Sequence, residues 1–248
     1  MASQFLTLSI QRFHKEKDPP RWIQTFELEP RKGMNLLEGL LRIQDEQDES
    51  LAFRYSCRGA VCGSCAMRVD GQIVLACRTS VQGLLRKPVL VEPLPFFPVI
   101  RDLIVDMSAF FESYRKIEPY LHGTSLPSDR ENRMDETKRK EIDPYVNCIL
   151  CGICFASCPA FDLDKQFMGP AMLAKAYRFF LDSRDTRTEE ILKLADGQKG
   201  VWGCKTVFNC LKVCPKEVPP THAIVKLRGQ ILRSRLGVLF RRLASLML

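Results

Sequence analysis

The chain has 248 residues, 46% of them apolar, which is enough for two domains that each have their own core. The formal net charge is +8, and because no acidic residue follows Glu217, the positive charge is concentrated near the C-terminal end. No apolar run reaches the roughly 20 residues of a membrane-spanning helix, so we expect that the chain itself does not span a membrane. The odd number of cysteines, eleven, argues against a fully paired disulfide framework and favours a reducing compartment. Residues 1–13 have the alternating pattern of a strand and no basic segment leading into an apolar core, so we expect no secretory signal.

The first hundred residues have the pattern of a small mixed sheet with one helix. Alternating apolar residues indicate strands, and an apolar stripe formed by leucines indicates an amphipathic helix. Asp70-Gly71 suits a type I′ turn because both positions tolerate positive φ. The predicted elements are strands at 6–13 and 22–28, a helix at 35–44, a hairpin at 66–69 and 72–76, and a strand at 89–91. This order is compatible with the β-grasp fold of plant-type ferredoxins.

From about Ile100 the apolar residues recur at helical intervals, through Leu103, Ile104 and Met107 to Tyr114. The prolines at positions 93, 95 and 98 therefore mark a boundary, which gives domains at residues 1–98 and 99–248. The second domain is predicted to be all-α, so that the chain as a whole is α+β. Further helices are predicted after Gly169-Pro170, over 186–195 and after Pro220, whereas the polar segment 122–141 is predicted to be an exposed connection.

The first group of cysteines has the C-x4-C-x2-C spacing of a plant-type [2Fe-2S] site. The predicted ligands are Cys57, Cys62, Cys65 and Cys77. Gly59 and Gly63 allow the backbone to wrap closely around a small inorganic group. A zinc site is the alternative, but this loop is a poor match for two CxxC knuckles.

The second and third groups form the only internal repeat. Cys148, Cys151, Cys154 and Cys158-Pro159 have the C-x2-C-x2-C-x3-C-P spacing of bacterial ferredoxins, and Cys204, Cys210 and Cys214-Pro215 repeat it with one ligand missing. In two-cluster ferredoxins the fourth cysteine of each run binds the other cluster. The predicted ligands are therefore Cys148, Cys151, Cys154 and Cys214 for a [4Fe-4S] cluster, and Cys158, Cys204 and Cys210 for the other.

Val207 occupies the position of the missing ligand. Because an aliphatic side chain cannot hold a fourth iron, the last cluster is predicted to be [3Fe-4S]. A water or an outside ligand that completes a four-iron cluster stays open at this point. Several clusters without an obvious substrate site indicate a carrier of single electrons.

The sequence resembles the iron-sulphur subunit of succinate dehydrogenases and fumarate reductases, the succinate:quinone oxidoreductases or complex II. The resemblance covers nearly the whole chain and is most specific at 56–67, 148–159, 169–185 and 209–216. It implies electron transfer between a flavoprotein subunit with covalent FAD, where succinate and fumarate interconvert, and a quinone at membrane anchor subunits. It also implies a part in the tricarboxylic acid cycle, the ligand sets given above, and no catalytic site in this chain.

The resemblance also implies a location. The protein would be peripheral, held by anchor subunits on the cytoplasmic face of a bacterial cell membrane or the matrix face of the mitochondrial inner membrane. Pro159, Lys205 and Arg228 are candidate quinone contacts, with Lys205 next to a ligand of the last cluster. The stretch 220–248 is predicted to be a helix against the anchor subunits, with an apolar stripe at Ile224, Leu227, Ile231, Leu239 and Leu243.

Two other functions are compatible with the residues. One is an electron-transfer subunit of a different flavin dehydrogenase, because fold and clusters do not choose the partner flavoprotein. The other is a zinc-stabilised nucleic-acid-binding protein, which the basic charge and the CxxC pairs could mimic. Interleaved basic and aromatic residues are missing from the sequence, so we expect no nucleic-acid partner.

Overall fold

The computed structural model describes residues 5–85, 88–123 and 131–246, and side chains up to residue 237. The chain forms two compact units. The first unit comprises Met1–Ser108 and Ile149–Ser157, and the second comprises Ala109–Cys148 and Cys158–Leu248. The domain boundary between residues 98 and 99 stays a prediction.

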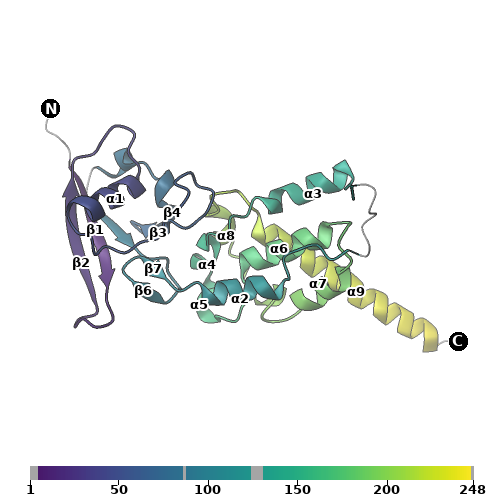
Figure 1. Ribbon diagram of the computed structural model, residues 1–248. Helices are drawn as coiled ribbons and strands as arrows, with labels where there is room; N and C mark the ends of the chain where they lie inside the picture. The colour runs from purple at the N-terminus through teal and green to yellow at the C-terminus, as the bar shows by residue number, and fades with distance from the viewer. Residues whose placement is uncertain (1–4, 86–87, 124–130, 247–248) are drawn as a thin grey trace. The chain divides into compact units, whose positions relative to one another are not determined.

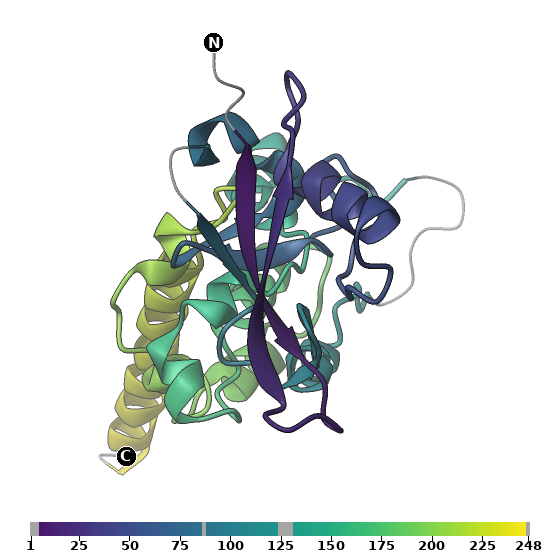
Figure 2. The same ribbon diagram turned by 90° about the vertical axis from the view of Figure 1, so that its left-hand side faces the viewer.

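The first unit contains a five-stranded mixed sheet with strand order β2-β1-β5-β3-β4 (Figure 1). β1 pairs with β2 along its whole length, as Figure 2 shows, and lies parallel to β5, with Leu8 opposite Val89. Burial alternates along β1, so Leu6, Leu8 and Ile10 face the core. The strands are β1 Leu6–Phe13, β2 Arg21–Leu28, β3 Ala66–Val69, β4 Gln72–Leu75 and β5 Val89–Glu92. They confirm the predicted strands over the described residues.

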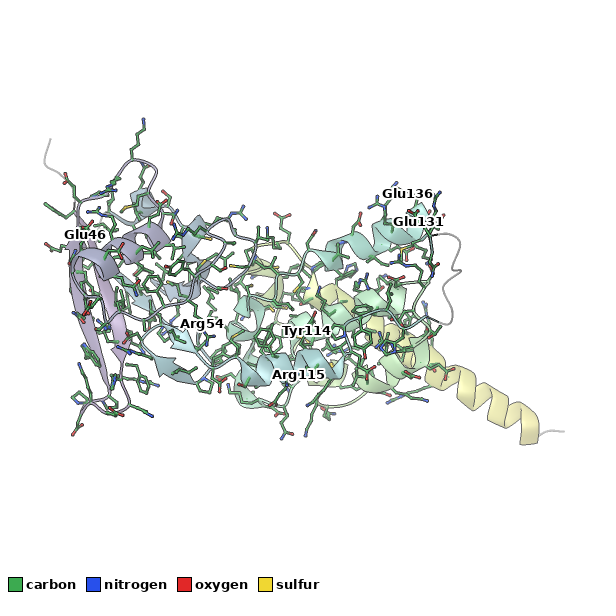
Figure 3. All side chains as sticks on the ribbon, viewed as in Figure 1. Glu46, Arg54, Tyr114, Arg115, Glu131 and Glu136 are labelled. Carbon is green, nitrogen blue, oxygen red and sulfur yellow. The ribbon has the colours of Figure 1, made fainter. Side chains whose placement is uncertain are left out.

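One helix, α1 (Leu36–Glu46), accompanies this sheet. It begins with a capping box, in which the Asn35 side chain accepts from the Glu38 backbone N–H and the Glu38 carboxylate accepts from the Asn35 N–H. Its leucines 36, 37 and 40 are buried, as predicted. Glu46, labelled in Figure 3, ends the helix and accepts two hydrogen bonds from Arg42. The helix is thereby fixed at both ends.

The hairpin β3–β4 turns at Asp70 and Gly71, where φ is +47° and +80°. Positive φ at both positions is the signature of the predicted type I′ turn. A short 3-10 helix, η1 (Ala76–Arg78), follows the hairpin and contains Cys77. The Ala76 backbone N–H donates to the Cys65 carbonyl over 3.0 Å. The turn therefore returns the chain to the loop that carries the other cysteines of the first group.

The predicted helix after Ile100 is wrong at its start. Residues 99–105 form a hairpin of β6 (Val99–Arg101) and β7 (Ile104–Val105), and helix α2 begins only at Ser108 and ends at Lys116. Asp102 turns this hairpin with φ +45°, and its buried carboxylate accepts from the Phe13 and Ala52 backbone N–H groups. These tertiary hydrogen bonds override the helical spacing of the apolar residues.

The second unit is helical and is built around α6 (Pro170–Leu181), which is buried on almost every side. α6 packs against α9 (Pro220–Leu246), α3 (Glu136–Val146) and α7 (Thr188–Ala195). The remaining short helices of this unit are α5 Pro159–Leu163, the 3-10 helix η3 Val201–Gly203 and α8 Asn209–Lys212, whereas the 3-10 helix η2 Val81–Leu84 and α4 Ile153–Ala156 belong to the first unit. The predicted helices after Pro170, near 186–195 and after Pro220 are confirmed.

The segment 122–141 is not all connection, as was predicted. Residues 124–130 lie outside the described residues, but Glu136–Glu141 belongs to α3. Asp135 caps this helix by accepting from the Thr137 N–H, and Glu136, labelled in Figure 3, lies in its first turn. Acidic groups at this end interact favourably with the helix dipole, so charge-rich residues stabilise a helix here.

The apolar stripe of α9 is directed inward in its first half. Ile224, Leu227 and Ile231 are at most 2% exposed. The prediction that these three residues form a groove-facing stripe for a partner is therefore wrong, because they pack in the core of the second unit. The side chains of Leu239 and Leu243 lie outside the described residues. Among the residues that the structure describes, no helix is long and apolar enough to cross a membrane.

A buried ion pair joins two segments of the second unit. Arg187 donates to the Asp185 carboxylate over 2.7 Å and to the carbonyls of Ile117, Glu118 and Tyr120. The two side chains are 7% and 1% exposed. Burial opposes ionisation of Asp185, but hydrogen bonds from Arg187 outweigh it and the pKa of Asp185 falls below its usual value. The pair fixes the chain after α2 to the turn before α7.

We expect Arg187→Met to lower the free energy of unfolding of the second unit by about 3–5 kcal/mol, because it leaves a buried carboxylate uncompensated. Denaturant unfolding followed by circular dichroism measures this loss. Arg133→Met is the control, since Arg133 is 86% exposed and pairs only at the surface with Glu131. Equal, small losses for both variants would contradict a structural role for the buried pair.

Candidate iron-sulphur centres

The first cysteine loop surrounds a sulphur atom with backbone N–H groups. Cys57 Sγ accepts from the N–H groups of Gly59, Val61 and Cys62 at 3.2–3.4 Å. The Cys57 N–H in turn donates to Cys62 Sγ over 3.4 Å. Arg58 and Ala60 adopt positive φ, which turns successive N–H groups inward. Such a nest binds anionic groups.

This environment favours a thiolate at Cys57. The N–H groups of Cys62, Gly59 and Val61 lower the pKa of Cys57 to about 6. Burial raises the pKa of Cys65 to about 12, and Cys65 also interacts with Cys77. The structure therefore brings Cys57 together with Cys62, and Cys65 together with Cys77. The donor set suits a negatively charged [2Fe-2S] group held by thiolates.

The four predicted ligands of the second centre belong to both units. Cys151 and Cys154 lie in the first unit, and Cys148 and Cys214 lie in the second. Gly152, with φ +77°, forms the N-cap of α4, directly after Cys151. In the second unit, Cys214 follows α8, and its carbonyl accepts from the Glu217 N–H.

The third group of cysteines borders a small apolar hollow within the second unit. Cys158 is the N-cap of α5, Cys204 follows η3, and Cys210 lies on α8. Cys204 Sγ accepts from the Thr206 N–H at 3.4 Å. Cys210 Sγ lies 3.1 Å from Thr221 Oγ1. Three thiols that border one hollow suit a cluster with three cysteine ligands.

Burial affects these thiols differently from Cys57. It raises the pKa of Cys158 and of Cys210, and the Thr221 hydroxyl only partly offsets this effect at Cys210. Bound iron would supply the positive charge that such buried thiolates need. No sequence pattern indicated Thr221, because its contact with Cys210 depends on how α9 passes α8.

The candidate quinone contacts have different surroundings. Pro159 and Lys205 border the hollow, together with Val207 and Phe208. Arg228 instead donates to the Val201 carbonyl at 2.7 and 3.0 Å, to the Cys204 carbonyl at 2.7 Å and to Thr206 Oγ1 at 3.2 Å. Arg228 therefore braces the loop that carries Cys204.

Trp202 contacts both Arg228 and a second arginine, Arg235. The guanidinium groups of Arg228 and Arg235 lie 5.7 and 5.9 Å from its ring centroid. Its Nε1–H donates to Asp196 over 2.6 Å, and Asp196 also accepts from Arg235. The indole is thus held from several directions, which restricts the chain just before Cys204.

Among the described residues, no three side chains of His, Cys, Asp or Glu converge closely enough to hold a single metal ion.

Two protein-family models match the chain. One describes a 2Fe-2S iron-sulfur cluster binding domain and covers residues 7–112. The other describes a 4Fe-4S dicluster domain and covers residues 145–218. Together with the fold, they define an electron-transfer protein with an N-terminal plant-type ferredoxin domain and a helical two-cluster domain, and they confirm the predicted α+β class.

Curated relatives identify the family. The chain is 39% identical over 232 residues to the succinate dehydrogenase iron-sulfur subunit of Coxiella burnetii, covering 92% of this chain and 97% of the relative. It is 37% identical over 237 residues to the fumarate reductase iron-sulfur subunit of Haemophilus influenzae, covering 90% and 91%. A solved Sdh1 complex of Mycobacterium smegmatis in the apo form contains a chain with the same fold (TM-score 0.81, 24% identity, covering 95% and 98%). The chain belongs to the family of iron-sulphur subunits of succinate dehydrogenases and fumarate reductases, as its motifs predicted.

Proposed function

We propose that this chain carries single electrons between a flavoprotein subunit with covalent FAD, which interconverts succinate and fumarate, and a quinone bound near membrane anchor subunits. The observation that carries the proposal is the grouping of all eleven cysteines into three sets, two of which lie in preformed thiol environments. Iron-sulphur clusters supply one-electron redox chemistry over a wide range of potentials. The chain provides the ligands, the spacing and the electrostatic surroundings.

The ligand sets follow the cysteine spacing. Backbone N–H groups around Cys57 support the first set, and the apolar hollow supports the last. The assignments are Cys57, Cys62, Cys65 and Cys77 for [2Fe-2S], Cys148, Cys151, Cys154 and Cys214 for [4Fe-4S], and Cys158, Cys204 and Cys210 for [3Fe-4S].

The three-iron assignment rests on what borders the hollow. Besides the three cysteines, its described lining contains no further cysteine, histidine or carboxylate, and Val207 occupies the expected ligand position. A fourth iron would therefore have no protein ligand there. Loss of one ligated iron changes the cluster charge and hence the reduction potential.

The surface beside this hollow is suited to the transfer of electrons from the third centre to a quinone. Val207 and Phe208 are 48% and 47% exposed, and Leu211 on α8 is also exposed. Lys205 adds a positive charge at the same edge. Apolar side chains with a nearby cation suit contact with an anchor subunit and a quinone headgroup. We place the chain at the cytoplasmic face of a bacterial membrane or the matrix face of the mitochondrial inner membrane.

A quinone-coupled assay of the intact complex in both directions tests this function. We expect reduction of quinone by succinate, or reduction of fumarate by quinol, to depend on this subunit. The same preparation should contain a flavoprotein with covalent FAD. Purification with a flavoprotein of another substrate specificity would instead support the alternative of a different flavin dehydrogenase.

We expect the purified single chain with its clusters to show no turnover of succinate with an artificial acceptor. The sequence lacks a flavin-binding glycine fingerprint and a convincing acid-base constellation, so the chemistry of the substrate belongs to the partner. The measurement is dye reduction by the single chain, with the assembled complex as the positive control. Substantial turnover by the single chain would contradict this division.

A further inference from the structure

Gly63, between Cys62 and Cys65, lies directly against a residue of the second centre. A Cβ atom built on Gly63 would lie 2.6 Å from Cys151 Cβ and 2.8 Å from Cys151 Cα. Both residues belong to the first unit, although 88 positions separate them in the sequence. The contact therefore joins the loop of the first cysteine group to the start of the second group.

The contact is too close for any other residue. Distances below 3.0 Å from a Cβ atom essentially do not occur, and the atoms that Gly63 meets include backbone atoms of Cys151, which cannot rotate away. Gly63 also has φ +74°, a left-handed conformation that favours glycine. Both the close approach and the backbone conformation select glycine here.

Two other glycines of the first unit lack one or both of these features. Gly71 has a similar φ of +80°, but a Cβ there would meet nothing within 4 Å. Gly59 lies in the same cysteine loop, and a Cβ there would meet only the Cys57 carbonyl oxygen at 3.7 Å. Gly63 alone among these three combines positive φ with a close approach to another cysteine group.

We propose that Gly63 is a positioning residue that sets the separation between the [2Fe-2S] and [4Fe-4S] centres and thereby the rate of electron transfer between them. The proposal rests on the ligand assignments of the proposed function. Tunnelling slows steeply as the distance between two redox centres grows. A side chain at Gly63 must push the Cys57–Cys65 loop and the Cys151 backbone apart, whereas the cysteines themselves remain available as ligands.

Electron paramagnetic resonance of the native complex, with both centres reduced, is the first test. Two paramagnetic centres held by touching loops broaden each other's signals and shorten each other's spin relaxation. We expect this magnetic interaction in the native protein. Signals of both clusters without any interaction would overturn the positioning role, and a missing cluster signal would instead contradict the ligand assignments.

The second test compares Gly63→Ala with two control variants in the assembled complex. Gly33→Ala and Gly71→Ala each add a Cβ at positive φ in open space, outside the cysteine loop. We expect Gly63→Ala to lose magnetic interaction and to slow electron transfer through the second centre, measured as the rate at which succinate reduces the third centre. Both controls should keep native behaviour.

Loss of a cluster from Gly63→Ala would also test the contact with Cys151. If Gly63→Ala loses one of the two centres while Gly33→Ala and Gly71→Ala retain both, the close approach to Cys151 is needed for assembly, which supports the contact. If Gly63→Ala keeps both centres with unchanged interaction and unchanged reduction rate, Gly63 does not set their separation.

Discussion

Replacing Val207 with cysteine is expected to convert at least part of the third centre from three irons to four. The new thiolate would occupy the position at which the repeated ligand pattern lacks a cysteine. We expect the signal of an oxidised three-iron cluster to decrease in electron paramagnetic resonance, and a reduced four-iron signal to appear. The reduction potential should fall, and transfer to quinone should slow.

The loop around Val207 is suited to this test. Val207 borders the hollow between two residues, Thr206 and Phe208, that adopt left-handed backbone conformations with φ +56° and +62°. The substitution is small and leaves these neighbours in place. Val207→Ala is the matched control, because it shortens the same side chain without adding a ligand. A native protein that shows no oxidised three-iron signal would contradict the ligand argument itself.

The strands of the first unit could be predicted because their signals are local. Alternation along β1 and the Asp70-Gly71 turn depend only on neighbouring residues. The segment after Ile100 could not, because its apolar spacing fits a helix equally well. There the buried Asp102 carboxylate binds backbone N–H groups of Phe13 and Ala52, which are distant in the sequence. Long-range hydrogen bonds of this kind leave no periodic pattern.

The cysteine ligands could be predicted for a similar reason. Short spacings force the backbone to wrap around one small group, so the ligands can be identified from cysteines that lie close together in the sequence. The side chains that stabilise the third centre could not be predicted in this way. Thr221 and Arg228 reach Cys210 and the Cys204 loop only because α9 passes beside them. The sequence suggested Arg228 as a quinone contact, which stays a prediction, but it gave no sign that its guanidinium braces a ligand loop.

Removing the guanidinium of Arg228 is expected to make the third centre labile. Arg228→Gln takes donors away from the carbonyls of Val201 and Cys204. Hydrogen bonds to charged groups contribute about 1.5–3 kcal/mol each, so several lost bonds can loosen the Cys204 loop substantially. We expect loss of iron from this centre, measured by iron analysis and by the amplitude of its paramagnetic signal. The reduction potential of the centre that remains should fall, because a positive charge beside a ligand loop favours the reduced state.

Two further variants identify which property of Arg228 matters. Arg228→Lys keeps the charge but cannot reproduce the planar set of donors, so it should preserve the potential better than it preserves the iron content. Arg233→Gln is the control, because Arg233 is an exposed residue on the same helix. An Arg228 that only contacted quinone would behave differently: its replacement would raise the KM for quinone while iron content and potential stayed at native values. The combination of cluster analysis and quinone kinetics therefore separates a brace of the Cys204 loop from a direct ligand of the quinone.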